Sequence, residues 1–257
     1  MLSYGICNLG IVPVRKEPSH RAEMINQLLF GEHFTVLETD KNWSKISLDF
    51  DNFEGYVNNL QFQKISKTTY LNLLETENIF SNEIIDFISS EDQNLTTIPL
   101  GASLPFFSKG ILSVNETKYN FEGKTTFGQL SKREIIRNAF IYLNTPYLWG
   151  GRTPFGIDSS GFTQMVYKLS GYSLPREVKE QANQGEVLSF IEESETGDLA
   201  FFDDEEGDII HVGIILNDYN IIHVHGKVRI DTLDHSGIFN SDLQTHTHKL
   251  RIIKKFI

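Results

Sequence analysis

The chain reads Pro146-Tyr-Leu-Trp-Gly-Gly-Arg-Thr-Pro-Phe-Gly-Ile-Asp-Ser-Ser-Gly-Phe-Thr-Gln164 where a loop becomes a helix, and this stretch decides the fold of its C-terminal half. A helix cannot continue through Pro146, and glycines punctuate the loop that follows. Apolar residues then recur at helical spacing from Phe162 to Leu169, and Gly171 is placed to end that helix as its C′ residue. Ser159 is therefore predicted in the first helical turn, at the positive end of the helix dipole.

A nucleophile at position 159 would gain from that location. The helix dipole and a nearby imidazolium would lower the pKa of a cysteine there and stabilise its thiolate. This chain has serine instead, and a hydroxyl is too weak an acid to ionise in the same way. A catalytic site arranged for a thiolate should therefore lose most of its catalytic rate when serine replaces cysteine. The alternative is that Asp158 or Ser159 only caps the helix.

The pattern on both sides of this stretch predicts an α+β domain. Upstream, Ser131-Lys-Arg-Glu134 fits a capping box at the start of another helix. Downstream of Gly197 come short strand patterns rather than helices, so the C-terminal half is predicted as helices followed by an antiparallel sheet. The predicted strands are Asp198–Phe202, His211–Leu216, Asn220–His225, Val228–Asp231 and Leu250–Phe256.

The N-terminal half has the short, regularly spaced strands of small β-barrels. Residues 1–62 form the first predicted domain, residues 63–125 a second small β-rich module, and residues 131–257 the α+β domain. In the first domain, strands are predicted at Ile11–Arg15, Met24–Phe30, His33–Glu38, Trp43–Leu48 and Gly55–Asn58. In the second, short helices are predicted around Tyr70–Leu74 and Ile84–Ile88, and strands at Thr97–Leu100 and Ile111–Val114.

Histidines lie on two consecutive predicted strands. In an antiparallel hairpin the residue opposite His211 falls near positions 223 to 226, so His211 and His223 can be neighbours. One could act as a general base while the other fixes its tautomer and orientation. His225 shares a strand face with His223 and competes for the second role. Each histidine could equally be an ordinary polar residue of a strand.

The same histidines leave a metal site open as an alternative. Two imidazoles at i and i+2, such as His223 and His225, can bind zinc or nickel. Asp231 or His235 could supply a third ligand, although no spacing rule favours either. His246-x-His248 gives the same weak signal and is more typical of a solvated turn.

Composition excludes several classes of function. The 257 residues carry a net charge of −11, which disfavours nucleic acid and anionic membrane surfaces as partners, and no apolar run is long enough to span a bilayer. The single cysteine, Cys7, cannot form an internal disulfide, and we expect it to fill space in the first barrel. The first residues lack the features of a secretory signal, so we expect a cytoplasmic protein.

Five motifs together resemble the NlpC-type family of papain-like bacterial cell-wall cysteine peptidases. The resemblance covers residues 131–257 in family order and spacing, and the N-terminal portion resembles the bacterial SH3-like (SH3b) domains of γ-D-glutamyl-L-diamino acid endopeptidases. It implies a papain-like α+β domain, helices packed on an antiparallel sheet, preceded by small SH3-like barrels. The motifs are the stretch 146–164, Leu174-Pro-Arg176, Gly197-Asp-Leu-Ala-Phe-Phe202, His211-Val-Gly-Ile214 and Ile221-Ile-His223.

The resemblance implies a role for each site residue. It places the family's nucleophilic cysteine on Ser159, its general base on His211 and its orienting third residue on His223. It also places an oxyanion-stabilising tyrosine on Tyr147. No cofactor and no metal is implied.

The resemblance also implies the substrate, a murein peptide with a free N-terminal L-Ala, and a protein that acts as a monomer. Asp158, Ser160 and Trp149 would bind the peptide. Glu23 and Tyr56 are the candidates in the first barrel for binding the free amino terminus.

Serine at position 159 departs from the family pattern, while the surrounding motifs are kept. We interpret it as an engineered substitution that inactivates a cysteine endopeptidase of peptidoglycan recycling. Two alternatives remain: a natural non-catalytic protein that binds muropeptides, and an enzyme that uses Ser159 itself as nucleophile. The last is disfavoured because no buried carboxylate partner for His211 is evident in the sequence.

Overall fold

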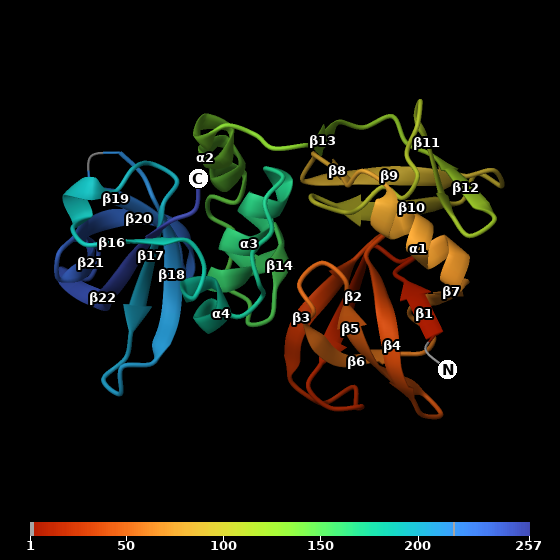
Figure 1. The fold of residues 1–257 in the computed structure, drawn as a ribbon, viewed down its shortest axis with the longest axis horizontal. Coiled ribbons are helices and arrows are strands. Elements are labelled where there is room, and N and C mark those ends of the chain that lie inside the picture. Colours follow the sequence, from red (N-terminus) through yellow and green to blue (C-terminus); the bar gives the residue numbers. More distant parts are fainter. Residues whose placement is uncertain (1–2, 218) are drawn as a thin grey trace. The chain divides into compact units, whose positions relative to one another are not determined.

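The computed structural model describes residues 3–217 and 219–257 (Figure 1). Contacts divide these residues into two units. The N-terminal unit contains residues 3–128 and 149–153, and the C-terminal unit contains residues 129–148 and 154–257. Each unit has its own hydrophobic core, so each is described by itself.

A seven-stranded antiparallel sheet forms the barrel of the N-terminal unit, in the order β3-β2-β6-β5-β4-β1-β7 (Figure 1). Its core contains Val12, Val14, Phe34 and Cys7, and burial raises the pKa of the Cys7 thiol to about 12, in agreement with a space-filling role. The five strands predicted in this region are all present. The strands are β1 (Ser3–Ile6), β2 (Ile11–Arg15), β3 (Met24–Leu29), β4 (His33–Thr39), β5 (Trp43–Leu48), β6 (Glu54–Asn58) and β7 (Gln63–Ile65).

A second, β-rich part of this unit follows the helix α1 (Lys67–Glu75), which Ser66 caps by accepting a hydrogen bond from the Thr69 amide at 3.0 Å. The helix predicted around Ile84–Ile88 is wrong, because this run of β-branched and aromatic residues lies in strand β9. Five residues are too few for periodicity to separate helix from strand. The strands are β8 (Ile79–Ser81), β9 (Ile85–Ser90), β10 (Leu95–Pro99), β11 (Ile111–Val114), β12 (Thr117–Asn120) and β13 (Thr125–Phe127); their order is β10-β9-β12-β11, and β8 pairs with β13.

A buried ion pair holds the segment 149–153 in the N-terminal unit. Both terminal nitrogens of the Arg152 guanidinium donate to the Glu32 carboxylate, at 3.0 and 2.9 Å. The Arg152 amide donates to Gln27 Oε1 at 2.8 Å, and Glu32 also accepts from the Leu29 amide at 2.9 Å. The side chains of Arg152 and Glu32 are 0% and 5% exposed, so each charge depends on the other for solvation.

The sheet of the C-terminal unit runs β16-β22-β17-β18-β19-β20-β21. Strand β22 pairs with both β17 and β21, so six strands close on themselves. The strands of this sheet are β16 (Glu186–Leu188), β17 (Leu199–Asp203), β18 (Ile209–Ile215), β19 (Asn220–His225), β20 (Lys227–Asp234), β21 (Gly237–Asn240) and β22 (Thr245–Lys255). The short strand β15 (Gly156–Ile157) also belongs to this unit, whereas β14 (Arg152–Thr153) lies in the segment 149–153 of the N-terminal unit.

Helix α3 (Ser159–Leu169) is the central helix of the C-terminal unit. It packs against α2 (Lys132–Ile141) and α4 (Val178–Ala182), and against strands β18 and β19. Gly171 ends it with φ +80°, as predicted, and the Tyr172 amide donates back to the Tyr167 carbonyl at 2.9 Å. A short 3₁₀ turn follows at Ile191–Glu193. Among the residues that the structure describes, every helix is too short or too polar to cross a lipid bilayer.

The start of α2 differs in one detail from the prediction. Ser131 is the N-cap residue, but its side chain makes no capping hydrogen bond in the described structure. The Glu134 carboxylate lies instead 3.5 Å from Arg137 on the next turn. The predicted capping box is therefore wrong, because its glutamate pairs along the helix surface.

Candidate active site

Ser159 is the first residue of α3, and its neighbour Asp158 is the N-cap. The Asp158 Oδ1 atom accepts a hydrogen bond from the Gly161 amide at 2.8 Å. Ser159 is half-buried, whereas Asp158 and Ser160 on either side are buried. Asp158, and not Ser159, is therefore the residue that caps the helix. Asp158 fixes the start of the helix, and this leaves the Ser159 side chain in its first turn.

Arg176 binds both neighbours of Ser159. Its Nη1 donates to Ser160 Oγ at 2.8 Å, and its Nη2 pairs with Asp158 Oδ2. Arg176 is only 3% exposed, and a buried arginine needs such a carboxylate partner. Arg176 belongs to the motif Leu174-Pro-Arg176, but no role was predicted for it. The pair immobilises the two residues that flank position 159.

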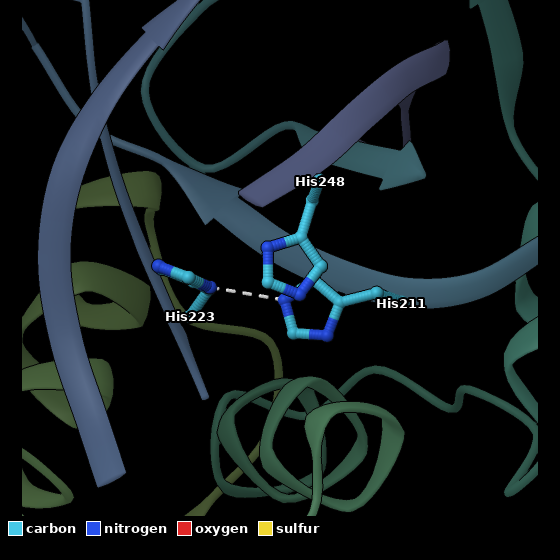
Figure 2. A group of neighbouring side chains, drawn as sticks. All are labelled: His211, His223 and His248. Carbon is cyan, nitrogen blue, oxygen red and sulfur yellow. Dashed lines mark hydrogen bonds between the residues drawn. The ribbon is translucent and has the colours of Figure 1, made fainter. Parts of the chain in front are cut away.

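His211 and His223 are brought together by strands β18 and β19. His211 Nε2 lies 3.0 Å from His223 Nδ1 (Figure 2). The register pairs Gly213 with His223, so the two histidines are diagonal neighbours. A Cβ atom at position 213 would approach the His223 Cβ to 2.8 Å, and glycine there leaves this space open. The sequence prediction that the two histidines are neighbours is confirmed.

Asp231 on β20 continues this chain of hydrogen bonds. Its Oδ2 lies 2.9 Å from His223 Nε2. Arg229 on the same strand donates from Nε and Nη2 to both oxygens of Asp231, at 2.7 and 2.8 Å. The Asp231 side chain is fully buried. Asp231 was predicted only as an alternative metal ligand, although Arg229-x-Asp231 on the strand after His223 was the available signal in the sequence.

The direction of the hydrogen bonds follows from the charges. Burial by itself would raise the pKa of Asp231, but the hydrogen bonds from His223 and Arg229 outweigh it and lower that pKa, so Asp231 is an acceptor. His223 must then donate from Nε2. Burial lowers the pKa of His223, although Asp231 opposes this effect, so the ring is neutral at pH 7 and its Nδ1 accepts. His211 therefore carries its proton on Nε2.

The free lone pair of His211 is thus on Nδ1. Burial, reinforced by the neighbouring rings of His248 and His223, lowers the pKa of His211 well below its usual value. In Figure 2 the second ring nitrogen of His211 points away from His223, toward the helical coil below the three rings. Helix α3, which begins at Ser159, packs on the strand of His211. The role of His211 as the base for a group at the start of that helix stays a prediction.

His248 is a third imidazole beside these two, and it is half-buried. The prediction that His246-x-His248 forms a solvated turn is wrong for His248, because both histidines lie in β22. Alternating threonines before each histidine suit a strand. The His248 ring stacks on His211 with centroids 4.0 Å apart and an interplanar angle of 26°. Burial lowers the pKa of His248 to about 3, and the nearby His223 and His225 rings add to this effect.

The metal alternative drawn from the sequence has the wrong ligands. His223 Nε2 is bonded to Asp231, and His235 is exposed. The group whose nitrogens do lie within 4.8 Å of one another is His211, His223 and His248 (Figure 2).

Tyr147 lies in the C-terminal unit, before β15. Its amide donates to the Gly226 carbonyl at 2.9 Å, and its side chain is 46% exposed. Burial of part of the ring raises its pKa, and the charge of Asp158 adds to this effect while Arg176 opposes it. The phenol is therefore a protonated donor at neutral pH, near the residue that caps α3. Its role in holding an oxyanion stays a prediction.

Comparisons with known proteins agree with this geometry. The NlpC/P60 family matches residues 144–247, and the bacterial dipeptidyl-peptidase Sh3 domain matches residues 14–61. The chain contains an NlpC/P60 domain and a bacterial SH3 domain. The NlpC/P60 match includes Ser159, His211 and His223, so the residues discussed above lie in the peptidase-family domain.

Several relatives share most of the chain. The gamma-D-glutamyl-L-lysine dipeptidyl-peptidase of Bacillus subtilis (strain 168) is 28% identical over 77% of this chain and 71% of its own length. Dipeptidyl-peptidase 6 of Lysinibacillus sphaericus is 25% identical over 89% of this chain and 92% of its own. The crystal structure of an NlpC/P60 family protein from Bacillus cereus ATCC 10987 matches with a TM-score of 0.83 and 17% identity, over 98% of this chain and 99% of that one. The predicted fold is therefore confirmed.

The remaining predicted residues belong to the N-terminal unit. In the SH3 domain, Tyr56 of β6 pairs with Arg15 of β2, and Glu23 directly precedes β3 on the other side of β2. Tyr56 is half-buried, and Glu23 is exposed, 3.5 Å from Lys16. Trp149 is 57% exposed in the segment 149–153. Glu23 and Tyr56 therefore lie on the two sides of strand β2. The substrate-binding roles of Glu23, Tyr56 and Trp149 stay predictions.

Proposed function

We propose that this chain is built to cleave the γ-D-glutamyl–L-diamino acid bond of murein peptides that carry a free N-terminal L-Ala, releasing L-Ala-D-Glu. The observation that carries the proposal is the chain of hydrogen bonds from Asp231 through His223 to His211, beside the helix that begins at position 159. The relatives named gamma-D-glutamyl-L-lysine dipeptidyl-peptidase support the choice of bond.

The mechanism requires a thiol at position 159. His211 Nδ1 takes the thiol proton, and the sulfur attacks the γ-carbonyl carbon of the D-glutamyl residue. Amides at the start of α3 and the Tyr147 hydroxyl hold the developing oxyanion. His211 then gives its proton to the leaving amine of the diamino acid. Water, deprotonated by the same nitrogen, hydrolyses the thioester and releases the dipeptide.

Serine at position 159 prevents the first step of this mechanism. A hydroxyl holds its proton far more tightly than a thiol, and the lowered pKa of His211 makes that imidazole a weak base. The chain as given should therefore bind the peptide without cutting it. We propose that Ser159 replaces a catalytic cysteine and inactivates the site.

Asp158 and Ser160 are the proposed contacts for the dipeptide part of the substrate. The Arg176 guanidinium neutralises Asp158 and orients Ser160, so both side chains are fixed before the peptide arrives. A substrate held by these two residues lies next to position 159. Preorganisation of this kind lowers the entropic cost of bringing the bond to the nucleophile.

Reversion of the nucleophile tests the proposal. The given chain, Ser159→Cys and Ser159→Ala are incubated with L-Ala-γ-D-Glu-L-Lys and with the diaminopimelate analogue, and released L-Ala-D-Glu is measured by mass spectrometry. We expect release by Ser159→Cys alone. The same peptide with an acetylated amino terminus is the matched control and should resist cleavage. Failure of Ser159→Cys to cut any of these peptides would overturn the proposed reaction.

A muropeptide-binding protein without catalysis is the second candidate. The observation that favours it is the hydroxyl at position 159 beside the intact Asp158–Arg176 pair. Tight binding of the peptide in calorimetry, with no turnover after Ser159→Cys, would support it. Covalent labelling of Ser159 by a fluorophosphonate would instead indicate a working serine nucleophile.

We also propose that the protein acts as a monomer on soluble murein fragments in the cytoplasm. The net charge of −11 supports small soluble peptides over an anionic wall polymer as the substrate. Fractionation of producing cells tests the location, and light scattering after gel filtration tests the monomer. Recovery in the wall fraction or a stable dimer would contradict this part.

A further inference from the structure

Three imidazoles converge on one point in the C-terminal unit. One ring nitrogen each from His211, His223 and His248 lies within 4.8 Å of the others, on strands β18, β19 and β22 (Figure 2). Tetrahedral zinc with ligands at about 2.0–2.1 Å needs nitrogens about 3.4 Å apart. His211 Nε2 and His223 Nδ1 are 3.0 Å apart, close to that separation, and the hydrogen bond between them must open for both to bind an ion.

Two of these rings are oriented as zinc ligands are. A histidine that binds zinc usually donates its other nitrogen to a carboxylate or another acceptor. His223 Nε2 donates to Asp231 at 2.9 Å, which leaves Nδ1 toward the centre. His248 Nδ1 lies 2.9 Å from Thr247 Oγ1, which leaves Nε2 for the centre. The partner of each remote nitrogen is thus already in place.

We propose that His211, His223 and His248 form a site for a zinc ion that switches the active site off. The inhibitory part of this inference rests on the proposed function, whereas the binding part does not. Zinc takes the lone pairs of His223 Nδ1, His248 Nε2 and His211 Nε2, and a water molecule is the fourth ligand. The proton on His211 Nε2 moves through solvent to Nδ1. The nitrogen that would accept the nucleophile's proton is then blocked.

Direct binding tests the site without any need for activity. The untagged chain as given is titrated with zinc in calorimetry, and with cobalt(II) while the visible absorption is recorded. We expect one ion per chain with a micromolar dissociation constant and the intense cobalt bands of a tetrahedral site. His248→Phe keeps an aromatic ring on His211 but removes a ligand, and should weaken binding at least tenfold.

His246→Phe is the matched control, because His246 lies on the same strand, is exposed and pairs with Asp234 outside the three-histidine group. It should bind zinc like the parent. Substoichiometric binding, or equal affinities for the His248→Phe and parent chains, would overturn the site. If circular dichroism shows that His248→Phe is unfolded, His248→Gln replaces it in the same comparison.

Inhibition is tested separately in the Ser159→Cys variant. Zinc should lower its rate at the concentration that half-saturates the site, a chelator should restore the rate, and His248→Gln should shift the inhibition to at least tenfold higher zinc. Binding without inhibition would overturn the switch but leave the site. Lack of activity in Ser159→Cys before zinc is added would contradict the proposed function and leave the binding result intact.

Discussion

Each unit buries a series of hydrogen-bonded polar side chains, and the two series differ in the group at which they end. In the N-terminal unit, the Arg152 guanidinium and the Glu32 carboxylate meet in a two-point ion pair, and Gln27 binds the same arginine. In the C-terminal unit, Asp231 orients His223, and His223 orients His211, whose Nδ1 is not part of the series. The first arrangement pairs its charges internally, whereas the second leaves a lone pair available.

The difference separates structural burial from functional burial. A buried ion pair contributes little beyond what two apolar residues would, but breaking it leaves an unpaired charge. Buried neutral imidazoles cost stability in acid, because the unfolded state takes up protons that the folded state refuses. We expect a protein to keep such destabilising histidines where the free ring nitrogen has a function. Changes at His211 should therefore affect activity, whereas changes at Glu32 should affect stability.

Removal of His211 should have the largest effect. In the Ser159→Cys background, His211→Ala removes the lone pair at the end of the series, and we expect a roughly 10²- to 10⁴-fold fall in kcat, the usual contribution of a general base. The rate of L-Ala-D-Glu release at saturating peptide measures it. A fall in kcat of less than threefold would show that His211, at the end of the hydrogen bonds that start at Asp231, is not the catalytic base.

Neutralising Glu32 should cost the N-terminal unit roughly 3–5 kcal/mol in free energy of unfolding. Glu32→Gln keeps one oxygen for the Leu29 amide, removes the charge that faces Arg152 and replaces one acceptor of the guanidinium by an amide nitrogen. Urea unfolding followed by tryptophan fluorescence reports on this unit, since Trp43 and Trp149 both belong to it. The double variant Glu32→Gln/Arg152→Met should recover part of the loss. No recovery would mean that the charge imbalance is not the cause.

Asp231→Asn should lower kcat in the Ser159→Cys background by roughly 10- to 100-fold and leave KM nearly unchanged, because Asp231 acts through His223 on the tautomer of His211. Asp242→Asn is the matched control. Asp242 also accepts from Arg229, at 2.9 Å, but does not contact His223. An equal loss in both variants would indicate that Arg229, and not the histidine tautomer, carries the effect.

Local features of the site could be predicted from the sequence. The helix start at Ser159 follows from the glycine-punctuated loop and the apolar spacing after it. The proximity of His211 and His223 follows from hairpin geometry, which fixes diagonal neighbours once two strands are paired. Both rest on interactions between residues close in sequence, where spacing determines geometry.

Residues that depend on long-range pairing could not be predicted. His248 reaches His211 only because β22 pairs with β17 and β21 and closes the sheet, and no local pattern specifies that closure. Arg176 binds the residues around Ser159 across 16 positions of sequence. The helix prediction for the short apolar run Ile84–Ile88 was wrong for a different reason. A run of this length suits either a helix or a strand, and only its tertiary pairing decides between them.

The smallest effect concerns pH. Asp49 in the N-terminal unit is partly buried, and this raises its pKa to about 6, although a hydrogen bond from Tyr70 opposes the rise. The folded state thus holds a proton that the unfolded state releases near pH 4. The resulting stability is present below about pH 4 and is lost as the pH rises through 6. His211, His223 and His248 act oppositely: their lowered pKa values preserve stability above about pH 6.5 and cost stability as the pH falls.

Asp49→Asn should therefore stabilise the N-terminal unit at pH 7.5, by roughly 1–2 kcal/mol, and have little effect at pH 4. Asparagine keeps an oxygen for the Tyr70 hydroxyl, so only the titration is removed. His33 Nε2 lies 3.5 Å from Asp49 Oδ2, so this histidine faces the same carboxylate. The tryptophan-detected urea midpoint is the measurement, with the exposed Asp92→Asn as control. A gain that is the same at both pH values would show that Asp49 is not the titrating group, and the contrast between the two units would then lie in the histidines alone.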